Sequence, residues 1–531
     1  MTLNFDIDYS LFPTPLTLDP CPSTPKPKTQ NQQTKPKTYK KTMKLNILLK
    51  ALRSYELTGA PEIDITEVLF DSRAVAAQPA GSSQLYVAQR GTQTDGHKYI
   101  PNAIAQGCRA VVCETLPETL DEKVCYIKVA DSSIALGMLA DAFYGHPSRK
   151  LKLTGITGTN GKTTTVTLLH RLFMSAGYHT GLISTIVNKI DDEEIPTNHT
   201  TPDAVELNRL LAQMVDRGCQ YCFMEVSSHA LCQHRVTGLK FAGAIFSNIT
   251  HDHLDFHKTF ANYIAAKKSF FDKLPKTAFA LTNIDDKNGR VMVQNTKASI
   301  HTYSLRTAAD FKGMVMENAF TGLHMRINNR EVYFKLCGQF NAYNLLAICG
   351  AAVLLGMEMD EVLMKMSMLE SASGRFQMLH NADGGTAIVD YAHTPDALEN
   401  VLKTIRDISG KEAEVITVVG CGGDRDALKR PEMAAIACKY SSKVILTSDN
   451  PRTEDPQAIL NDMIQGVPAS KSKNVLVIEN RHEAIKTGCM FLQSGGVLLV
   501  AGKGHETYQE INHVKHHFDD TEELKKCFNI Q

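Results

Sequence analysis

The sequence has no excess charge of either sign and no long apolar run, and each absence excludes a class of protein. Its 531 residues contain 57 Lys plus Arg against 57 Asp plus Glu, so no global field attracts nucleic acid or an anionic membrane. No apolar run reaches the roughly 20 residues of a membrane span, and the N-terminus lacks the apolar core of a signal peptide. We therefore expect no nucleic-acid partner, no membrane association and a cytoplasmic location.

The sequence also lacks a disulfide framework. Its 13 cysteines are an odd number, scattered through apolar segments, which is typical of a reducing compartment. Cys219 and Cys222 have the spacing of metal ligands, but no second pair follows at a suitable distance. We therefore interpret them as buried thiols beside a strand.

Length and composition predict a tail followed by three α/β domains. The chain is too long for one core. Residues 1–42 interleave seven prolines with polar residues, which predicts a disordered tail or a mis-assigned start before Met43. We expect a first domain at 43–148, a central domain at 149–372 and a third domain at 373–531. In the first domain, short strands at 67–70, 84–88, 110–113 and 125–129 with one or two helices are expected.

A glycine-rich loop organises the central domain. An apolar run at 151–157 reads as a buried strand, and Val166, Leu169 and Phe173 then recur at helical spacing. Strand, glycine loop and helix form the context of a phosphate-binding loop, with Lys162 reaching the phosphates and the Thr163 hydroxyl binding magnesium. The loop has fewer residues between its glycines than the usual pattern. It comprises Gly158, Thr159, Asn160, Gly161, Lys162, Thr163 and Thr164.

Further polar residues follow strand-like runs of the same domain, so they should meet at one edge of a parallel sheet. Glu225 and His253 could converge with Thr163 on a metal ion. Their oxygen donors and the adjacent phosphate loop favour magnesium; the alternative is a zinc site of His251, His253 and His257. Chemistry alone predicts that Lys267, on a helix, is a solvated lysine.

The third domain alternates strand-like runs with helical patterns, which predicts a second doubly wound unit. The strands are expected at 386–390, 414–420, 443–447, 474–478 and 496–501. Gly420 and Gly422 suggest a dinucleotide fingerprint, but its third glycine position is taken by Arg425. A nicotinamide site is therefore rejected.

Ten ordered motifs between Met43 and about Tyr508 resemble those of the Mur ligases. They are GTNGKTT, EVSSHALCQHRV, SNITHDHLDFH, AAK before Ser269, GRFQ, DYAHTPDALEN, GCGGDRD, KRPEM, DNPRTEDP and AGKGHE. The resemblance implies an N-terminal uridine-binding α/β domain, a central P-loop ATPase-like domain with a mostly parallel sheet, and a C-terminal Rossmann-like domain. It is strongest to the branch of the family that adds meso-diaminopimelate to UDP-N-acetylmuramoyl-L-alanyl-D-glutamate in peptidoglycan synthesis.

The resemblance implies that ATP phosphorylates a substrate carboxylate, and that an amine then attacks the acyl phosphate. The implied catalytic residues are Lys162, Glu225, His253 and Lys267, the last as N6-carboxylysine. Mg²⁺ would be held by Thr163, Glu225, His253 and the modified Lys267. Besides the glycine loop, Asn344 and Arg375 would contact ATP, with Asp390 and His393 nearby.

Substrate contacts are implied position by position. The uridine and muramoyl-dipeptide moieties would contact Phe70, Ser72, Thr92, Gln93, Thr94, His199, Thr200, Thr201, Ser227, Gln233 and Arg235. Diaminopimelate would contact Arg425, Asp449, Asn450, Pro451, Arg452, Gly502 and Glu506. Arg452 can bind the second carboxylate of diaminopimelate, which lysine lacks, through two parallel hydrogen bonds.

The prediction from the sequence is therefore a monomeric, ATP- and Mg²⁺-dependent ligase. Within the same class the alternatives are a lysine-adding or other Mur ligase, or a folylpolyglutamate synthetase. From a different class, the alternative is a Mur-ligase-like scaffold without catalysis. The scaffold would be expected to have damaged motifs, whereas Lys162, Glu225, His253, Lys267 and Arg452 are all present.

Overall fold

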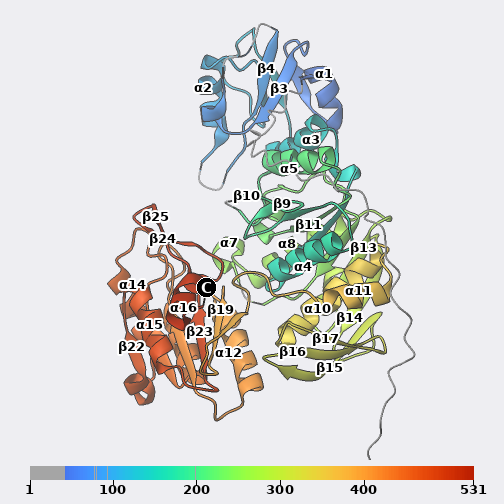
Figure 1. The fold of residues 1–531 in the computed structure, drawn as a ribbon. Helices are drawn as coiled ribbons and strands as arrows, with labels where there is room; N and C mark the ends of the chain where they lie inside the picture. The colour runs from blue at the N-terminus through green and yellow to red at the C-terminus, as the bar shows by residue number, and fades with distance from the viewer. Residues whose placement is uncertain are drawn as a thin grey trace, which may run out of the picture. The chain divides into compact units, whose positions relative to one another are not determined.

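The computed structural model describes residues 42–530, except residues 77, 79, 80, 92, 93, 198 and 251. Three large sheets with helices packed on them follow one another along this part of the chain (Figure 1). The predicted α/β fold class is confirmed. Residues 1–41, which hold nearly all of the predicted tail, lie outside the described residues, and the predicted domain boundaries stay predictions.

The first sheet has a parallel centre and antiparallel edges, in the order β1-β3-β4-β5-β6-β2. The four parallel strands match the four predicted ones within a few residues, but the helices are more numerous than expected. The elements are β1 (Met43–Lys44), α1 (Leu45–Leu48), β2 (Glu56–Thr58), β3 (Asp64–Leu69), β4 (Ser82–Val87), α2 (Ile100–Ala105), β5 (Ala110–Cys113), β6 (Cys125–Lys128) and α3 (Ser132–Phe143).

The central sheet has eleven strands, in the order β10-β9-β8-β11-β7-β12-β13-β14-β15-β16-β17. Its strands are β7 (Lys152–Thr157), β8 (Thr180–Ile183), β9 (Asn188–Ile190), β10 (Glu193–Ile195), β11 (Tyr221–Glu225), β12 (Gly243–Phe246), β13 (Phe279–Asn283), β14 (Ser299–Ser304), β15 (Phe311–Ala319), β16 (Gly322–Ile327) and β17 (Arg330–Phe334). The run from β8 to β15 is parallel, as predicted. The antiparallel strands at both edges were not predicted.

Helices cover both faces of the central sheet, because successive strand side chains point to opposite faces. In β11, Phe223 packs in one core cluster with α4 and α10, whereas Cys222 and Met224 pack in a second cluster with α5 and α8. Cys219 belongs to the same second cluster, so the pair of cysteines is buried, as predicted. The helices are α4 (Lys162–Ser175), α5 (Ala204–Asp216), α6 (Ser228–Cys232), α7 (Leu254–His257), α8 (Phe260–Asp272), α9 (Gly289–Met292), α10 (Gln339–Leu354) and α11 (Met359–Met366).

The third sheet is the predicted doubly wound unit, in the order β18-β19-β23-β20-β21-β22, with only β18 antiparallel. A separate hairpin, β24–β25, was not predicted. The strands are β18 (Gln377–His380), β19 (Thr386–Asp390), β20 (Val415–Val419), β21 (Lys443–Leu446), β22 (Val475–Val477), β23 (Val497–Ala501), β24 (Tyr508–Ile511) and β25 (Val514–His517). The helices are α12 (Pro395–Ser409), α13 (Lys429–Tyr440), α14 (Pro456–Ile464), α15 (Arg481–Phe491) and α16 (Asp520–Phe528).

No helix among the described residues is long and apolar enough to cross a membrane.

A fully buried ion pair ties the last two helices to the third sheet. Arg481 at the start of α15 donates two hydrogen bonds of 2.7 Å to the carboxylate of Asp520 at the start of α16. It also donates to the carbonyl of Ala501 at the end of β23, at 3.1 Å. Both charged side chains are 0% exposed. The carboxylate compensates the charge of the guanidinium through its Nε and one of its terminal nitrogens, so removing one partner leaves a charge buried without compensation.

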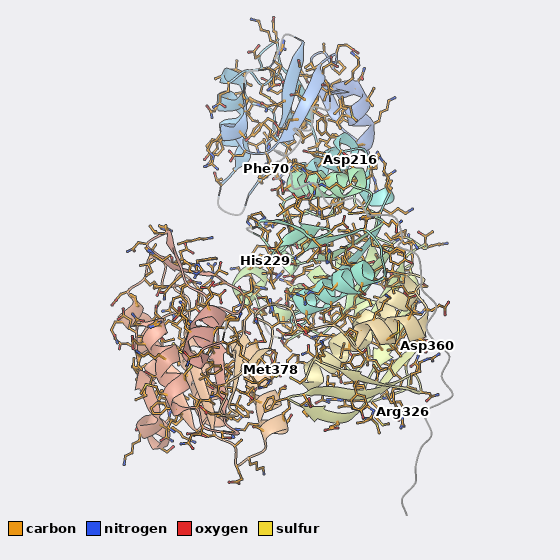
Figure 2. The ribbon with its side chains drawn as sticks, in the orientation of Figure 1. Phe70, Asp216, His229, Arg326, Asp360 and Met378 are labelled. Carbon is orange, nitrogen blue, oxygen red and sulfur yellow. The ribbon has the colours of Figure 1, made fainter. Side chains whose placement is uncertain are left out.

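We predict that Asp520→Ala destabilises the domain of the third sheet by about 3–5 kcal/mol, the cost of stranding a buried guanidinium. The matched control is Glu331→Ala, which breaks an ion pair between Arg326 (labelled in Figure 2) and Glu331 whose side chains are 41% and 49% exposed. That variant should unfold like the wild type, since solvent screens exposed pairs. Urea unfolding followed by circular dichroism measures both, and equal losses would contradict the prediction.

Candidate functional site

The glycine loop after β7 has a backbone that only glycine tolerates. Gly158 and Gly161 have φ angles of 153° and 85°, in the region that L side chains rarely adopt. A Cβ atom on Gly158 would lie 2.0 Å from Ser247 Oγ, and one on Gly161 would lie 2.3 Å from Asn344 Oδ1. The loop is therefore packed directly against the segment after β12 and against α10, which places the predicted ATP residue Asn344 beside the loop.

The segment after β12 holds the glycine loop through its backbone. Thr159 N donates to the Asn248 carbonyl at 2.8 Å, and Asn160 N donates to the Asn248 side chain at 3.0 Å. The Thr159 hydroxyl lies 3.2 Å from the hydroxyl of Tyr263 on α8. The loops at the carboxyl ends of β7 and β12 thus meet at one edge of the sheet, as predicted.

Two lysines converge on one carbonyl of this loop. Lys162 Nζ and Lys267 Nζ both donate to the Gly158 carbonyl, at 3.1 and 2.7 Å. Lys267 is 1% exposed, and its ammonium lies 4.7 Å from the centroid of the Tyr263 ring. Burial lowers the pKa of Lys267 well below its ordinary value, and the charge of Lys162 lowers it further, while Asp252 opposes the shift. Lys267 is thus no solvated lysine but a buried amine within the site.

The carboxylate of Glu225, at the end of β11, is fully buried and faces the same group of charges. It accepts hydrogen bonds from the backbone and hydroxyl of Thr185, at 2.8 and 3.2 Å. Burial lowers the pKa of Lys162, and the charges of Glu225 and Asp252 oppose that shift. The structure therefore brings Glu225, Asp252 and the two lysines within electrostatic range of one another.

His253 lies in a group of aromatic side chains before α8. It precedes α7 with a φ of 53°, and its ring is 4.8 Å from that of His229, which is labelled in Figure 2. The His257 Nε2 atom is 2.9 Å from Ser228 Oγ, so His257 is engaged with α6. Among the described residues no three His, Cys, Asp or Glu side chains form a metal-binding group, and His251, named for the zinc alternative, lies outside them.

Five residues predicted to contact the muramoyl-dipeptide form one hydrogen-bonded cluster. Thr201 donates to the carbonyl of Glu225 at 2.8 Å and lies 3.4 Å from Ser227 Oγ. Arg235 donates to the Thr201 carbonyl at 2.6 Å and, twice, to the side chain of Gln233. Thr200 accepts from Thr185, the residue that also binds Glu225. His199 exchanges hydrogen bonds with Thr197 outside this cluster.

The residues predicted for the uridine end lie in the first sheet's loops. Phe70, labelled in Figure 2, is 38% exposed, whereas Ser72 is buried. Asp71 between them accepts from the Arg73 backbone at 3.0 Å and fixes the turn. The Thr94 hydroxyl is 3.3 Å from the hydroxyl of Tyr99. Thr92 and Gln93 lie outside the described residues, so the structure says nothing of them.

The loops after β21 and β23 meet at the third sheet, and their residues form one polar cluster there, which we name the pocket: Asp449, Asn450, Gly502, Lys503 and Glu506. Asn450 donates to Glu506 at 2.7 Å and accepts from the buried Lys503 at 3.0 Å. A Cβ atom on Gly502, whose φ is 117°, would lie 2.5 Å from the Asp449 carboxylate. Four of the seven residues predicted for the amino acid, Asp449, Asn450, Gly502 and Glu506, are therefore together.

Arg452 is fixed beside this pocket by the unpredicted hairpin. Its guanidinium donates to the Gly423 carbonyl at 2.7 Å and lies 3.5 Å from the Glu510 carboxylate. Its backbone bonds to Glu510 and Asn512, at 3.0 and 2.7 Å, and its φ of 53° is left-handed. Pro451, immediately before it, is buried. Arg425 is exposed and bonds to the neighbouring Asp424 carbonyl, and among the described residues no hydrogen bond joins it to the pocket.

Arg375 links the phosphate loop to the third sheet. It donates to Thr163 Oγ1 at 3.0 Å and lies 4.8 Å from the Tyr391 ring. Burial raises the pKa of Asp390 to about 6, against the opposing charge of Arg375. Burial lowers the pKa of His393 to about 4, and the charge of Lys429 acts in the same direction. Of the four residues predicted to lie near ATP, Asn344 and Arg375 therefore contact the glycine loop.

Known proteins resemble the chain over most of its length. Models described as "Mur ligase family, catalytic domain", "Mur ligase middle domain" and "Mur ligase, glutamate ligase domain" match residues 64–144, 156–352 and 374–504. The UDP-N-acetylmuramoyl-L-alanyl-D-glutamate--2,6-diaminopimelate ligases of Phocaeicola vulgatus and Bacteroides thetaiotaomicron are 57% and 56% identical. Each alignment covers 92% of this chain and 99–100% of the relative. The chain belongs to the Mur ligase family.

Solved structures agree with this assignment. A UDP-N-acetylmuramoyl-L-alanyl-D-glutamate--2,6-diaminopimelate ligase is 33% identical with a TM-score of 0.66, and the match covers 92% of this chain and 99% of that chain. The folylpolyglutamate synthase of Thermotoga maritima is 15% identical with a TM-score of 0.55, over 70% of this chain and 90% of that chain. At that identity the second likeness concerns the fold alone.

The donors around the glycine loop of this Mur ligase fit a magnesium ion bound together with phosphates. Thr163 offers a hydroxyl and Glu225 a carboxylate, which are hard oxygen ligands. Lys267 fits the same ion only if its amine becomes an anionic oxygen donor, because an ammonium would repel a dication. Its depressed pKa favours the neutral amine, the form that can react with carbon dioxide.

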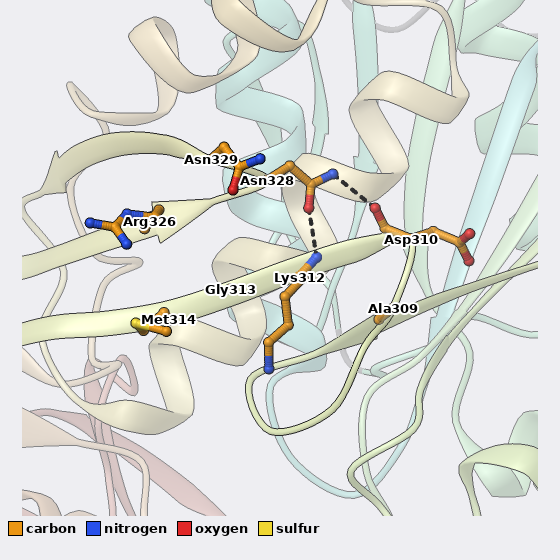
Figure 3. A pocket seen from close by; sticks show the side chains of 8 residues that line it. All are labelled: Ala309, Asp310, Lys312, Gly313, Met314, Arg326, Asn328 and Asn329. Carbon is orange, nitrogen blue, oxygen red and sulfur yellow. Dashed lines mark hydrogen bonds between the residues drawn. The ribbon is translucent and has the colours of Figure 1, made fainter.

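Several residues of the Mur ligase site were not predicted individually. Asp252, Asn248 and Lys503 each stand inside a motif that the sequence pointed out, so the motif was the available signal. Thr185 and Glu510 stand outside every motif, and only the fold brings them to Glu225 and Arg452. A surface hollow of about 460 Å³ (Figure 3) contains none of the predicted residues. It is lined by Ala309, Asp310, Lys312, Gly313, Met314, Arg326, Asn328 and Asn329.

Proposed function

We propose that this Mur ligase joins meso-diaminopimelate to UDP-N-acetylmuramoyl-L-alanyl-D-glutamate, using ATP, in peptidoglycan synthesis. Relatives that are 54–57% identical over 92% of the chain are named for this reaction. The observation that carries the choice of amino acid is that Asn450 links two charged groups: it donates to Glu506, and it accepts from the backbone of Glu510, whose carboxylate pairs with Arg452. A cation and an anion close together suit a substrate end that carries both a carboxylate and an ammonium.

The chemistry of amide formation requires that a carboxylate become a better electrophile. Transfer of the γ-phosphoryl group of ATP to the substrate carboxylate gives an acyl phosphate, which the amine attacks through a tetrahedral intermediate. Phosphoryl transfer between two anions needs positive charge near the transferred group. Lys162, which donates to the Gly158 carbonyl, and Arg375, which donates to the Thr163 hydroxyl, would supply it at the glycine loop.

We propose that Lys267 is carbamylated and that, with Thr163, Glu225 and His253, it holds Mg²⁺. A bound Mg²⁺ would neutralise charge on the phosphates. The proposal is supported by the burial of Lys267, by its depressed pKa and by its position between Lys162 and Tyr263. Carbamylation replaces one of two crowded cations with an anion, which relieves the repulsion between Lys162 and Lys267.

The muramoyl-dipeptide would bind next to Glu225. The cluster of Thr200, Thr201, Ser227, Gln233 and Arg235 offers hydroxyls, an amide and a guanidinium at the end of β11. These groups are bonded to the backbone around Glu225, so a ligand held by them would reach the glycine loop of the neighbouring strand. Phe70 and Ser72 would contact the uridine end.

The first prediction tests the reaction itself. Purified protein with ATP, Mg²⁺ and UDP-N-acetylmuramoyl-L-alanyl-D-glutamate should release ADP when meso-diaminopimelate is added, and far less with L-lysine. The buried polar groups around Arg452 would be left unpaired by lysine. Turnover with lysine alone would contradict the assignment. Turnover with glutamate on a folate substrate would favour a folylpolyglutamate synthetase, and no turnover with any substrate would favour a scaffold.

The second prediction concerns Lys267. Lys267→Ala should abolish turnover, and formate or acetate at high concentration should restore part of it by supplying the missing carboxylate. The matched control is Lys268→Ala, since that neighbouring lysine pairs with Asp272, four residues further along α8, at 2.7 Å. The control should keep wild-type turnover. Full activity of Lys267→Ala would refute the carbamate proposal.

The third prediction concerns Arg452. Arg452→Lys should raise the KM for diaminopimelate by about one to two orders of magnitude, because about 1.5–3 kcal/mol of charged hydrogen bonding is lost. The KM values for ATP and the UDP-linked substrate should stay near those of the wild type and serve as internal controls. An unchanged KM for diaminopimelate would mean that Arg452 does not bind its second carboxylate.

A further inference from the structure

Lys503 is a buried cation that the sequence did not single out. It follows β23 and is 0% exposed. Its ammonium donates to Asn450 Oδ1 at 3.0 Å and lies 3.3 Å from Glu506 Oε2. It also lies 5.5 Å from the centroid of the Tyr508 ring on β24. Its two hydrogen-bond acceptors are thus both residues of the proposed amino-acid pocket, and the three side chains form a closed triangle, since Asn450 donates to Glu506 at 2.7 Å.

We propose that Lys503 is a positioning residue for diaminopimelate, which holds the Glu506 carboxylate charged and aligned to receive the distal ammonium of the substrate. This inference rests on the proposed function and deepens it. Among the residues that the structure describes, Lys503 is the one charged donor hydrogen-bonded to Glu506. It does not itself need to touch the substrate, because its ammonium is fully buried behind the two residues it holds.

The electrostatics around Glu506 support this role. Burial and the charge of Asp449 raise the pKa of Glu506, while the charge of Lys503 and the Asn450 amide hold it down. The other titratable groups that sense Glu506 are Tyr391 after β19, Tyr508 on β24 and Arg481 on α15. Without Lys503, burial and the charge of Asp449 would raise the pKa of Glu506 further and favour its neutral form. A neutral acid pairs poorly with an ammonium.

The experiment compares Lys503→Met with Lys515→Met in the full chain. Lys515 lies 4.1 Å from the same Tyr508 ring but is exposed and bonds to no pocket residue, so it controls for loss of a cation at this hairpin. Near neutral pH, Lys503→Met should raise the KM for diaminopimelate by about tenfold or more, with kcat and the KM for the UDP-linked substrate little changed. Lys515→Met should behave as the wild type.

The pH profile separates this role from a merely structural one. In Lys503→Met the KM for diaminopimelate should fall as pH rises from mildly acidic to mildly alkaline values, because the Glu506 carboxylate loses its proton and regains its charge once pH exceeds its raised pKa. The wild-type KM should be flat over that range. The proposal would be overturned if the KM of Lys503→Met for diaminopimelate were raised but independent of pH, or if it were unchanged from the wild type.

A double-mutant comparison provides the second test. If Lys503 acts through Glu506, the variant with both Lys503→Met and Glu506→Gln should have the KM of Glu506→Gln alone. Effects that multiply would overturn the proposal. If Lys503→Met does not fold, the comparison of the double variant with Glu506→Gln is sufficient on its own. The double variant should fold, because it leaves no buried carboxylate at position 506 without its cationic partner. If the wild-type protein does not use diaminopimelate, the proposed function is refuted. If the wild type uses diaminopimelate but the Lys503→Met variants do not show the expected KM values, only the role of Lys503 is refuted.

Discussion

The site depends on two lysines that share one carbonyl oxygen. Lys162 and Lys267 approach the Gly158 carbonyl together, in surroundings where burial lowers the pKa of both. Two like charges that bond to the same oxygen atom repel each other strongly in a low dielectric. The arrangement is stable only if one lysine loses its charge or if anions gather around them. Glu225 and Asp252 supply part of that anionic charge, and a nucleotide triphosphate and a carbamate would supply the rest.

The pocket of the third sheet contains a buried cation that is already paired with an anion, unlike the two lysines at the glycine loop. There the buried cation, Lys503, already has its partner in Glu506, and the Asn450 amide satisfies both. A paired buried charge is held in one place, which is what recognition of a small zwitterionic substrate requires. Two lysines thus meet at the glycine loop, where we propose that phosphate binds, whereas the pocket holds a cation and an anion already paired, where we propose that the amino acid binds.

Local patterns predicted the parts of this structure that local physics controls. The strand, glycine loop and helix at 151–175 follow from apolar runs and two glycines with positive φ, and the five parallel strands of the third sheet follow from apolar runs between helices. The edge strands β10 and β17 and the hairpin β24–β25 carry no comparable signal, because their mostly exposed, mixed residues can equally form loops. Lys267 shows the same limit, since a lysine on a helix is usually solvated, and it is packing against Tyr263 and Gly158 that buries this one.

Hydrogen bonds join the glycine loop to segments of the third domain. We therefore expect that binding of the nucleotide affects binding of the amino acid. Asp396, at the start of α12, accepts from Asn160 of the loop at 3.1 Å and from Thr250 at 2.9 Å. Arg375 reaches Thr163 from just before β18. A phosphate bound at the loop must therefore meet side chains of both segments. In the proposed reaction, the amine attacks only after the carboxylate has been phosphorylated. These contacts would hold the domain proposed to bind diaminopimelate close to the glycine loop, where the acyl phosphate would form.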